Sequence, residues 1–570
     1  MNLWTKTWLL YRLGKFFATR YRHNSHYRFT VPGNPRFVGP WEAAQLIPDA
    51  AVLGVSGLGG VQWASIMYWA IRELYQETGH PKDLTVVAVG GQGARGRSPG
   101  SLEELGLPGL CTRLFTGHFE TFKSLLRLAD AGQCELQCLP QGVLAFLVDG
   151  QGRGEESWAT STGVGTLVDP RLGRGTPVAN PDGQQWVTIE GDQLRFRAPK
   201  ITVAVFNAPS ADREGNIYVR HCAMIGESYE IAKAARRNGG VVIANVGRIV
   251  EKGHDEVFLR PDEVDAIVFY PNTAQACSVK HFEHWPLFTT ESDLPLEEGI
   301  ARLKFMNHIL GFTPRRNEVD HALARLAASV FAQNACKGSL VNIGTGLPEE
   351  ACRLICEGGL FHDITLFTES GVVGGLPAPG VYFGSAVCPR EVVSSAAIFK
   401  RCYDGLDISI LGMLQVDSHG NVNASKRGDG AINYVGPGGF IDFSSIAKTV
   451  VFVSSWMVRP TIRLNGGRLS IVSPGQPKFV DQVDEITFSG QQAVASGRKI
   501  FYVTNVGVFR LTPRGVELTQ VAPGIDIQRD ILDATPMRIV LPESGQVPVV
   551  DESIMTGRGF RLGLRERCAC

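Results

Sequence analysis

The sequence predicts an α/β protein with two related open domains, each built on a mainly parallel sheet, and an antiparallel or mixed portion in the C-terminal half. A repeated order of strand, glycine turn, helix, strand and glycine turn occupies residues 51–93 and again 339–371. Such a unit needs a right-handed crossover and a parallel sheet. A second echo pairs Asp212-Arg-Glu-Gly-Asn216 with Asp417-Ser-His-Gly-Asn421. A length of 570 residues also exceeds what one core organises.

The first half supplies the first of these units. We expect, in chain order, a helix at 41–47, a strand at 51–55, a glycine turn at 56–60, a helix at 63–77 and a strand at 84–89. The longer helix follows from apolar residues at helical spacing, among them Ile66, Trp69 and Leu74. Residues 181–197 read as a β-hairpin insertion.

The second half repeats the unit. We expect a helix at 318–335, a strand at 339–343, a glycine turn at 344–348, a helix at 349–356 and a strand at 364–367. Residues 468–518 alternate like antiparallel strands, which predicts a mixed sheet edge. The chain then divides into an extension at 1–35, a first domain at 36–300, a linker at 301–317, a second domain at 318–550 and a tail at 551–570.

Composition limits the classes of function. Hydrophobic residues make up 44% of the chain and charged residues 20%, which is ordinary for a globular protein. The formal net charge of zero gives no indication of a nucleic-acid partner. Cys134/Cys138 and Cys352/Cys356 lack companion histidines, so we expect no metal site and free thiols in a reducing compartment. We therefore expect a cytoplasmic protein, or a mitochondrial one if the organism is eukaryotic.

The two ends of the chain are unusual. Residues 1–35 carry basic side chains and no acidic one, with apolar residues near helical spacing. Such a helix can lie on an anionic membrane surface or contact a partner, serve as a transit peptide, or pack on the protein itself or on a second subunit. No apolar run is long enough to span a membrane. The tail Cys568-Ala-Cys570 could be lipidated or bind a metal, but it does not fit the C-a-a-X prenylation motif.

Glu369 is the candidate reactive residue. It follows the buried strand at 364–367, and in open α/β sheets the ligand crevice lies outside the carboxyl ends of the strands. Gly371, Gly374 and Gly375 let a backbone approach a bulky ligand and donate N–H groups to it. The alternative is that Glu369 only caps a turn or a helix start.

Two common chemistries are excluded by missing motifs. The chain has no phosphate-binding loop and no H-E-x-x-H. A carboxylate among glycine turns remains, and a carboxylate can be a covalent nucleophile. With an ordinary pKa of about 4.3, Glu369 would be ionised at neutral pH and need no general base. Attack on a thioester makes an oxyanion, which glycine-turn N–H groups and a glutamine amide can stabilise.

Several long motifs resemble family I coenzyme A transferases, in particular the single-chain acetate/propionate branch with fused halves. The segment Phe367–Gly384 resembles the active-site region of that family. Further matching motifs lie, in the right order, at 411–423, 436–442, 479–490 and 521–526, and the likeness covers roughly 36–540. Departures at Arg427–Gly430 and Asn505–Phe509, and the extension at 1–35, leave the acyl specificity open.

The resemblance implies the coenzyme A (CoA) transferase fold and an enzyme that moves CoA between a short-chain acyl-CoA and a free carboxylic acid. The reaction would be ping-pong, through a glutamyl-CoA thioester on Glu369. It also implies no tightly bound cofactor, with CoA and acyl-CoA as substrates, and a homo-oligomer. Two alternatives stay open: an acyl-CoA hydrolase on the same scaffold, and a non-catalytic CoA-binding or membrane-docked scaffold.

The resemblance also implies roles for further residues. Gln141 matches a glutamine that orients the nucleophile or its oxyanion from the first domain. Gly438 and Gly439 match the turn whose amide forms the oxyanion hole. The CoA or acyl path would be lined by Gly344, Gly346 and Gln415, and Lys448 would contact a CoA phosphate.

Overall fold

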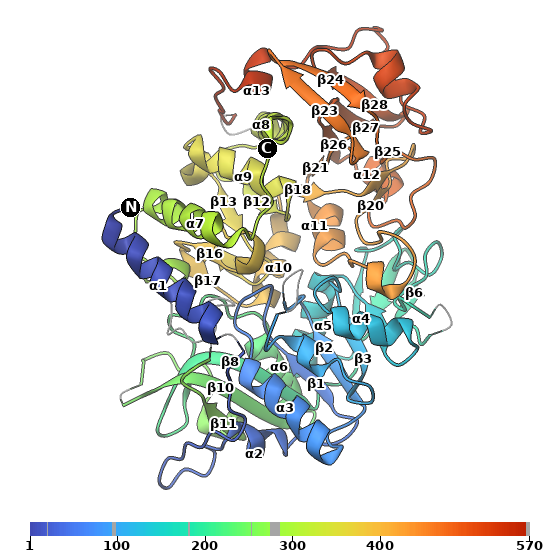
Figure 1. Cartoon of the computed structure of the whole chain (residues 1–570). Helices are drawn as coiled ribbons and strands as arrows, with labels where there is room; N and C mark the ends of the chain where they lie inside the picture. The colour runs from blue at the N-terminus through green and yellow to red at the C-terminus, as the bar shows by residue number, and fades with distance from the viewer. Residues whose placement is uncertain (20, 94–97, 181–182, 252, 274–285, 566–570) are drawn as a thin grey trace.

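The computed structural model describes residues 1–19, 21–93, 98–180, 183–251, 253–273 and 286–565. Two large sheets form the centres of two domains that are stacked on each other (Figure 1). Helices cover both faces of each sheet, which gives the predicted α/β class. The boundaries of the domains stay a prediction, but the predicted linker at 301–317 is helical as far as Leu310.

The first sheet has eight strands in the order β11-β10-β8-β1-β2-β3-β4, with β9 paired to β8. They are β1 (Val52–Val55), β2 (Leu84–Ala88), β3 (Cys111–Thr116), β4 (Glu135–Cys138), β8 (Val203–Asp212), β9 (Ile217–Tyr218), β10 (Val241–Val250) and β11 (Ala266–Phe269). All pairs are parallel except that of β8 with β9. Every residue of β2 and β8 is buried, as expected for strands covered on both faces.

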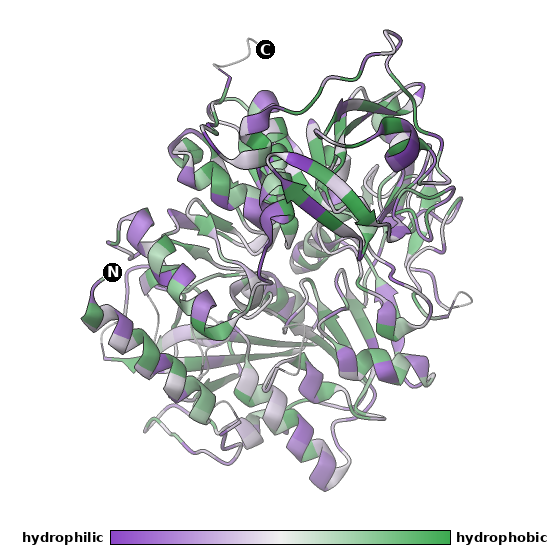
Figure 2. Cartoon of the chain, turned by 45° about the horizontal axis from the view of Figure 1, so that its top comes forward, coloured by the Kyte–Doolittle hydropathy of each residue, from purple (hydrophilic) through white to green (hydrophobic). Residues whose placement is uncertain are grey.

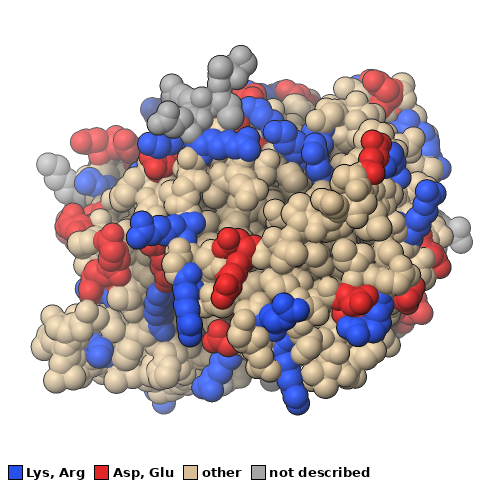
Figure 3. Space-filling model, turned by 90° about the horizontal axis from the view of Figure 1, so that it is seen from above, with Lys and Arg blue, Asp and Glu red and all other residues tan. Residues whose placement is uncertain are grey.

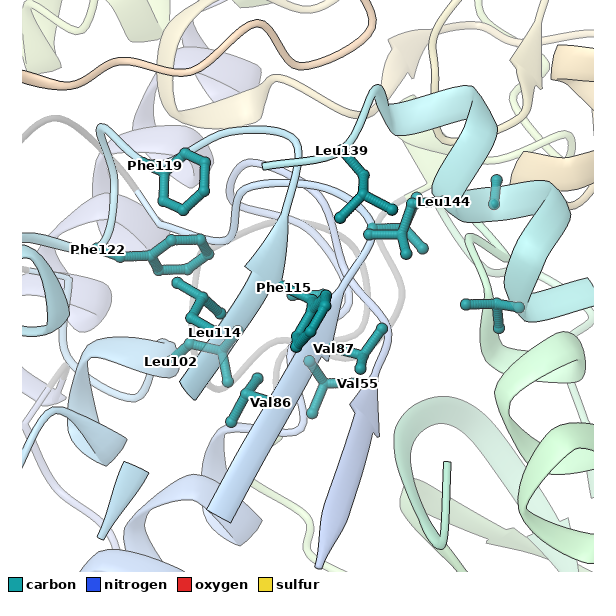
Figure 4. Packing of buried hydrophobic residues seen from close by; sticks show 14 of the residues in the cluster. Val55, Val86, Val87, Leu102, Leu114, Phe115, Phe119, Phe122, Leu139 and Leu144 are labelled. Carbon is teal, nitrogen blue, oxygen red and sulfur yellow. The ribbon is translucent and has the colours of Figure 1, made fainter. Parts of the chain in front are cut away.

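The helices of this domain are α2 (Pro40–Ala44), α3 (Ser65–Thr78), α4 (Lys123–Asp130), α5 (Gln141–Arg153) and α6 (Ser228–Arg237). Helix α3 ends where Gly79 adopts a left-handed φ of 76° and its N–H bonds back to Tyr75. Side chains such as Val87 of β2, Phe115 of β3 and Leu144 of α5 fill the space between sheet and helices (Figure 4).

The predicted hairpin insertion is present in its described part. Strands β6 (Val187–Glu190) and β7 (Gln193–Phe196) are antiparallel, and β5 (Trp158–Thr160) adds a third strand. Residues 181 and 182 of the predicted range lie outside the described residues.

The second sheet has nine strands in the order β17-β14-β13-β12-β18-β21-β26-β27-β28. They are β12 (Leu340–Ile343), β13 (Thr365–Phe367), β14 (Val372–Val373), β17 (Glu391–Val392), β18 (Ile408–Gly412), β21 (Thr449–Val453), β26 (Lys499–Thr504), β27 (Gly507–Thr512) and β28 (Gly515–Val521). The five central strands from β13 to β26 are parallel and both margins are antiparallel, which confirms the predicted mixed portion.

Smaller elements surround this sheet. The helices are α7 (Leu296–Leu310), α8 (Glu318–Asn334), α9 (Leu347–Glu357), α10 (Ser395–Gly405), α11 (Phe440–Ile446), α12 (Gly490–Ala495) and α13 (Glu552–Thr556). Four two-stranded ribbons pair β15 (Leu376–Pro377) with β16 (Ala386–Val387), β19 (Gln415–Val416) with β20 (Val422–Asn423), β22 (Met457–Val458) with β25 (Gln476–Pro477), and β23 (Thr461–Asn465) with β24 (Arg468–Ser473).

The echoed motifs form the same turn in both domains. Asp212 accepts the backbone N–H of Asn216 at 3.0 Å and its side-chain amide at 2.8 Å. Asp417 accepts the two corresponding groups of Asn421, each at 3.0 Å. Each aspartate accepts hydrogen bonds from backbone N–H groups that would otherwise lack partners at the turn. The repeated motif therefore stabilises the same turn in both domains.

The N-terminal segment forms helix α1 (Leu3–Thr19), which packs on the protein's own body. Leu9 and Leu13 are buried in a cluster with Leu303 and Met306 of α7, and the two helices lie side by side in Figure 1. The amino group of Met1 pairs with Glu298 at 3.4 Å. No described helix has the length and hydropathy needed to cross a bilayer. The cysteine tail at 568–570 lies outside the described residues.

The distribution of hydrophobic and hydrophilic residues agrees with the packing of helices around the two sheets. Hydrophobic residues run along the strands in the middle of the molecule, whereas hydrophilic residues colour much of the peripheral helices (Figure 2). Basic and acidic side chains are interspersed on the face shown in Figure 3, so that face carries no single-sign field of the kind that attracts nucleic acid.

Candidate active site

Glu369 lies at the carboxyl end of β13, on the side of the second domain that faces the first. Because β12, β13, β18, β21 and β26 are parallel, their carboxyl ends share this edge of the sheet. The Glu369 side chain is surrounded by protein atoms yet keeps partial solvent exposure. A group with that placement can meet a ligand, which a carboxylate inside a closed core could not do.

The turn that carries Glu369 is held by its glycines. Gly371 has a φ of 93°, and a Cβ added there would stand 2.0 Å from the carbonyl oxygen of Val393. Val393 in turn donates its N–H to Gly371 at 2.8 Å. Only glycine permits both the left-handed conformation and this close approach, so the glycine fixes the path of the chain just after Glu369.

Gly439 presses directly against the Glu369 carboxyl group. A Cβ at Gly439 would lie 3.0 Å from Oε1 of Glu369 and 3.2 Å from its Cδ. The N–H of the neighbouring Gly438 is engaged by the carbonyl of Gly117 at 2.7 Å, whereas the N–H of Gly439 has no hydrogen-bond partner within the described segments. Of the two predicted glycines, Gly439 is therefore the one with a donor available beside Glu369.

Gln141 approaches from the first domain. It begins α5, is 1% exposed, and its backbone N–H donates to the carbonyl of Gly438 at 3.1 Å. Its side-chain amide faces Glu369 closely enough to lower the pKa of that carboxyl, but Nε2 makes no well-aligned hydrogen bond to any described residue. A buried amide N–H that is not already paired can donate a hydrogen bond to an oxyanion that develops at this position.

Asp442 is a second carboxyl group at the site that the sequence reasoning missed. It is fully buried in α11, where Oδ2 accepts the N–H of Gly142 at 3.0 Å and Oδ1 accepts the hydroxyl of Tyr403 at 2.9 Å. The Tyr403 oxygen also lies 3.0 Å from Oγ1 of Thr162 in the first domain. Burial raises the pKa of Asp442 to about 7.

The electrostatic state of Glu369 differs from the sequence-based expectation of an ordinary pKa. Burial, followed by the nearby Asp442 charge, raises the pKa of Glu369 to about 7, and the contact with Gln141 opposes this shift. Removing water and adding a like charge both destabilise the ionised form. The raised pKa of Glu369 has a chemical consequence, because a more basic carboxylate is a stronger nucleophile once it is ionised.

Three predicted ligand-path residues lie at the same edge of the second sheet. Gly344 directly follows β12, and its N–H is already engaged by Ile410 at 2.8 Å. Gly346 precedes α9 with a φ of 90° and open space around it. In Gln415, which begins β19, Oε1 accepts hydrogen bonds from Asn423 at 2.7 Å and from Asp484 at 2.9 Å.

Lys448 is not brought to this edge, and its contact with a CoA phosphate stays a prediction. It precedes β21, so it lies at the amino ends of the parallel strands, and its amine pairs with Asp407 at 2.8 Å. Lys478 has the better position. Its amine lies 2.5 Å from the hydroxyl of Ser454, which directly follows β21, and burial lowers the pKa of Lys478 to about 8.

Comparison with known proteins gives consistent results. A family model described as coenzyme A transferase matches residues 41–258. The caffeate CoA-transferase of Acetobacterium woodii is 34% identical over 519 residues, which cover 87% of this chain and 93% of that protein. The acetate CoA-transferase YdiF of Escherichia coli K12 is 29% identical over 550 residues, which cover 93% of this chain and 98% of that one.

Solved structures agree with these relatives. The chain resembles the acyl-CoA transferase YdiF of Escherichia coli O157:H7, solved as apoenzyme and as a thioester complex with CoA. The TM-score is 0.81 at 27% identity, over 94% of this chain and 100% of that chain in both cases.

Proposed function

The chain belongs to the coenzyme A transferase family, and we propose that it moves CoA between a short-chain acyl-CoA and a free carboxylic acid through a covalent intermediate on Glu369. The observation that supports this most is the position of the Glu369 carboxyl. It lies against Gly439 of its own domain and faces the Gln141 amide of the other domain.

The proposed reaction has two symmetrical halves. Glu369 attacks the thioester carbonyl, the C–S bond breaks, and a mixed anhydride and the CoA thiolate form. The thiolate then attacks the Glu369 carbonyl and expels the first carboxylate, which leaves a glutamyl-CoA thioester. The second carboxylate attacks this thioester and reverses both steps with its own acyl group. No proton has to move, because every nucleophile and leaving group is an anion.

The N–H of Gly439 and the Nε2 donor of Gln141 would stabilise the tetrahedral oxyanions. Oriented donors of this kind act most strongly where water is excluded, since they need no reorganisation during the reaction. The same exclusion protects the anhydride and thioester from hydrolysis. The hydrogen bond from Gly142 to Asp442 joins the start of α5 in the first domain to the second domain. This contact supports oxyanion stabilisation and the exclusion of water, because it holds the start of α5 beside Glu369.

The path for the CoA chain would run along the carboxyl edge of the second sheet. Gly346 leaves room there for a bulky ligand, and Gly344 and Gln415 flank the same edge. We propose Lys478 instead of Lys448 as the cation for a CoA phosphate, since it stands at this edge beside Ser454.

A kinetic assay separates this function from the acyl-CoA hydrolase alternative. The enzyme is given acyl-CoA with and without acetate, and both free CoA and acetyl-CoA are measured. We expect acetyl-CoA to form much faster than free CoA. Release of free CoA at the same rate without an acceptor acid would assign the chain as a hydrolase. No turnover in either case, with CoA still bound, would assign it as a scaffold.

We also propose that the outer face of α1 contacts an anionic bilayer. Leu3, Trp4 and Tyr11 are 80%, 78% and 66% exposed, and Lys6 is exposed on the same helix. No acidic residue precedes Glu42. Aromatic rings and basic side chains together suit the interface of a negatively charged membrane.

Vesicle sedimentation of the full chain tests this contact. We expect binding to vesicles that contain phosphatidylglycerol, little binding to phosphatidylcholine alone, and loss of binding in Trp4→Ser/Tyr11→Ser. Leu172→Ser is the matched control, because Leu172 is 69% exposed far from α1 in sequence. Equal binding to both vesicle types would contradict the proposal. So would a double variant that still binds vesicles like the wild type and differs only in its oligomeric state. The homo-oligomer itself stays a prediction.

A further inference from the structure

The loop formed by residues 425–439, here called the oxyanion loop, brings Gly439 to the active site. It belongs to neither of the two large sheets. Its two ends meet, because the N–H groups of Val435 and Gly436 donate to the carbonyl of Ser425 at 2.8 and 3.1 Å. Ordering a loop costs conformational entropy. A loop that positions a catalytic donor therefore needs further contacts that hold it.

Glu485 of the second domain supplies such contacts at both ends of the oxyanion loop. Its Oε2 accepts the hydroxyl of Tyr434 at 3.0 Å and also accepts the hydroxyl of Ser425. The Ser425 oxygen lies 2.8 Å from Oγ1 of Thr487. Since Ser425 opens the loop and Tyr434 stands just before the glycine turn at 436–439, one carboxylate oxygen ties these two points together.

Arg174 connects this carboxylate to the first domain. Its Nε donates to Oε1 of Glu485 at 2.9 Å, its Nη2 donates to the hydroxyl of Tyr434, and its Cζ stands 5.1 Å from the centre of the Tyr434 ring. The side chains of Arg174 and Glu485 are 18% and 10% exposed. The chain that follows Arg174 is bound to β4, where the N–H of Cys138 donates to the carbonyl of Thr176 at 2.7 Å. Arg174 is therefore fixed to the first sheet while it contacts the oxyanion loop.

The donors and acceptors of these three side chains fit one arrangement. The guanidinium of Arg174 only donates, and Glu485 accepts at both oxygens, as a carboxylate does. The hydroxyl of Tyr434 gives its one proton to Glu485 and accepts from Arg174. Hydrogen bonds with a charged partner are stronger than neutral ones, and the planar fork of arginine fixes their directions. The three side chains therefore form a closed triangle that resists displacement of Tyr434.

Main-chain bonds to the first domain continue from Tyr434 along the glycine turn. The carbonyl of Val435, the next residue, accepts the N–H of Phe119 at 2.8 Å. Gly438 donates its N–H to the carbonyl of Gly117 at 2.7 Å. A displacement of Tyr434 would move the acceptors and donors of these bonds, and with them the glycine N–H that follows.

We propose that Arg174 is a positioning residue, which acts through Glu485 to hold the N–H of Gly439 in place. The oxyanion would be stabilised by this N–H and by the Gln141 amide of the other domain, so the two donors must converge on one point. Donors that are aligned before the charge develops stabilise the transition state most. Loss of the link leaves the loop folded but lets the N–H of Gly439 turn away. This inference rests on the proposed function, in which Gly439 is an oxyanion donor.

Arg174→Met and Tyr434→Phe test the link from its two sides. Each should lower kcat by about tenfold or more, with a smaller change in KM, because misplaced donors affect the transition state more than substrate binding. Tyr434→Phe is the more selective variant, since it leaves the ion pair between Arg174 and Glu485 in place. Arg174→Lys should recover part of the kcat, because lysine keeps the charge but not the fork.

A combined variant tests whether the two residues act on the same link. Arg174→Met/Tyr434→Phe should lose little more kcat than the slower of the single variants, because the second change removes a link that is already broken. Two residues with separate effects would instead give losses that multiply.

Arg302→Met is the matched control. Arg302 of α7 is 19% exposed and pairs with Glu298 at 3.1 Å, so it loses a comparable ion pair at a distance from the oxyanion loop in sequence. This variant should keep the kcat of the wild type. Thermal unfolding of every variant sets an assay temperature at which all are folded. If Arg174→Met does not fold, the kcat of Tyr434→Phe decides.

Two results would overturn the inference: a wild-type kcat in Tyr434→Phe, or losses that multiply in the combined variant. Mass spectrometry distinguishes this from failure of the proposed function. If the wild type forms no CoA adduct on Glu369 during turnover, the proposed function is wrong. If the wild type forms the adduct and Arg174→Met forms it equally fast, only the role of Arg174 is wrong.

Discussion

The backbone N–H of Gly142 donates to Oδ2 of Asp442 at 3.0 Å, so a carboxyl group of the second domain caps the helix of the first domain that carries Gln141. Helix α5 lacks a side-chain cap of its own at this end, since Pro140 precedes it. The positive end of a helix stabilises a nearby negative charge. The cap therefore aligns Gln141 and places a second acidic group beside Glu369.

Removing the charge of Asp442 should shift the acidic side of the pH profile. In Asp442→Asn the like charge that raises the pKa of Glu369 is gone, so ionised Glu369 becomes more stable. We expect kcat/KM to persist to lower pH than in the wild type, whose acidic midpoint should lie near the Glu369 pKa of about 7. Profiles of kcat/KM against pH check this, and an unmoved acidic side would rule out the coupling.

Gln141→Ala should reduce kcat by about 10²–10³-fold, the usual effect of removing one oxyanion donor. KM should change less, because the donor matters most when negative charge develops. Gln151→Ala on the same helix is the control. Its amide donates to Pro199 at 2.9 Å and accepts from Ile201 at 3.0 Å, so we expect lower stability with kcat retained. If Gln141→Ala and Gln151→Ala have the same kcat, Gln141 does not stabilise the oxyanion.

Gly439→Ala should inactivate the enzyme without unfolding it. The new Cβ would stand 3.0 Å from Oε1 of Glu369 and 2.7 Å from a ring carbon of Phe443, so the carboxyl must move from its place. Gly405→Ala is the control, because nothing lies within 4 Å of a Cβ there. Steady-state kinetics with thermal unfolding decide the matter. Full activity in Gly439→Ala would show that the carboxyl does not need this position.

The pH dependence of stability should reflect buried acids. Burial raises the pKa of Glu227 to about 8 and that of Glu230 to about 7, from an ordinary 4.5. Each contributes stability that is fully present below about pH 4.5 and is lost as the pH rises through its folded-state value. The wild type should therefore lose Tm between about pH 5 and pH 9, whereas the double variant Glu227→Gln/Glu230→Gln should not lose this contribution. The Tm of the variant minus that of the wild type should increase over this range. A constant difference would contradict the raised pKa values.

The sequence predicts the position of Glu369 because strand and turn patterns are local. An apolar strand that runs into a glycine turn places the next side chain at the carboxyl edge, whatever the rest of the chain does. The same rule places Lys448 elsewhere. It directly precedes an apolar strand, so it belongs to the opposite edge. Gln141 was identified through family resemblance and not through such a pattern.

The remaining site depends on contacts between distant segments. Asp442, Tyr403 and Gln141 come together only because α5, α10 and α11 meet at the junction of the domains. No spacing in the sequence indicates that junction. The raised pKa of Glu369 has the same origin, since burial and Asp442 cause it. These features follow from tertiary packing and were therefore not predictable from local patterns.

Mass spectrometry of the protein during turnover tests the central claim most directly. After exposure to acyl-CoA, the peptide that contains Glu369 should carry a CoA adduct, and adding a carboxylic acid should remove it with formation of the new acyl-CoA. Glu369→Ala should fold and carry no adduct. An unmodified Glu369 peptide in an enzyme that is turning over, or equal turnover by Glu369→Ala, would contradict covalent transfer through this residue.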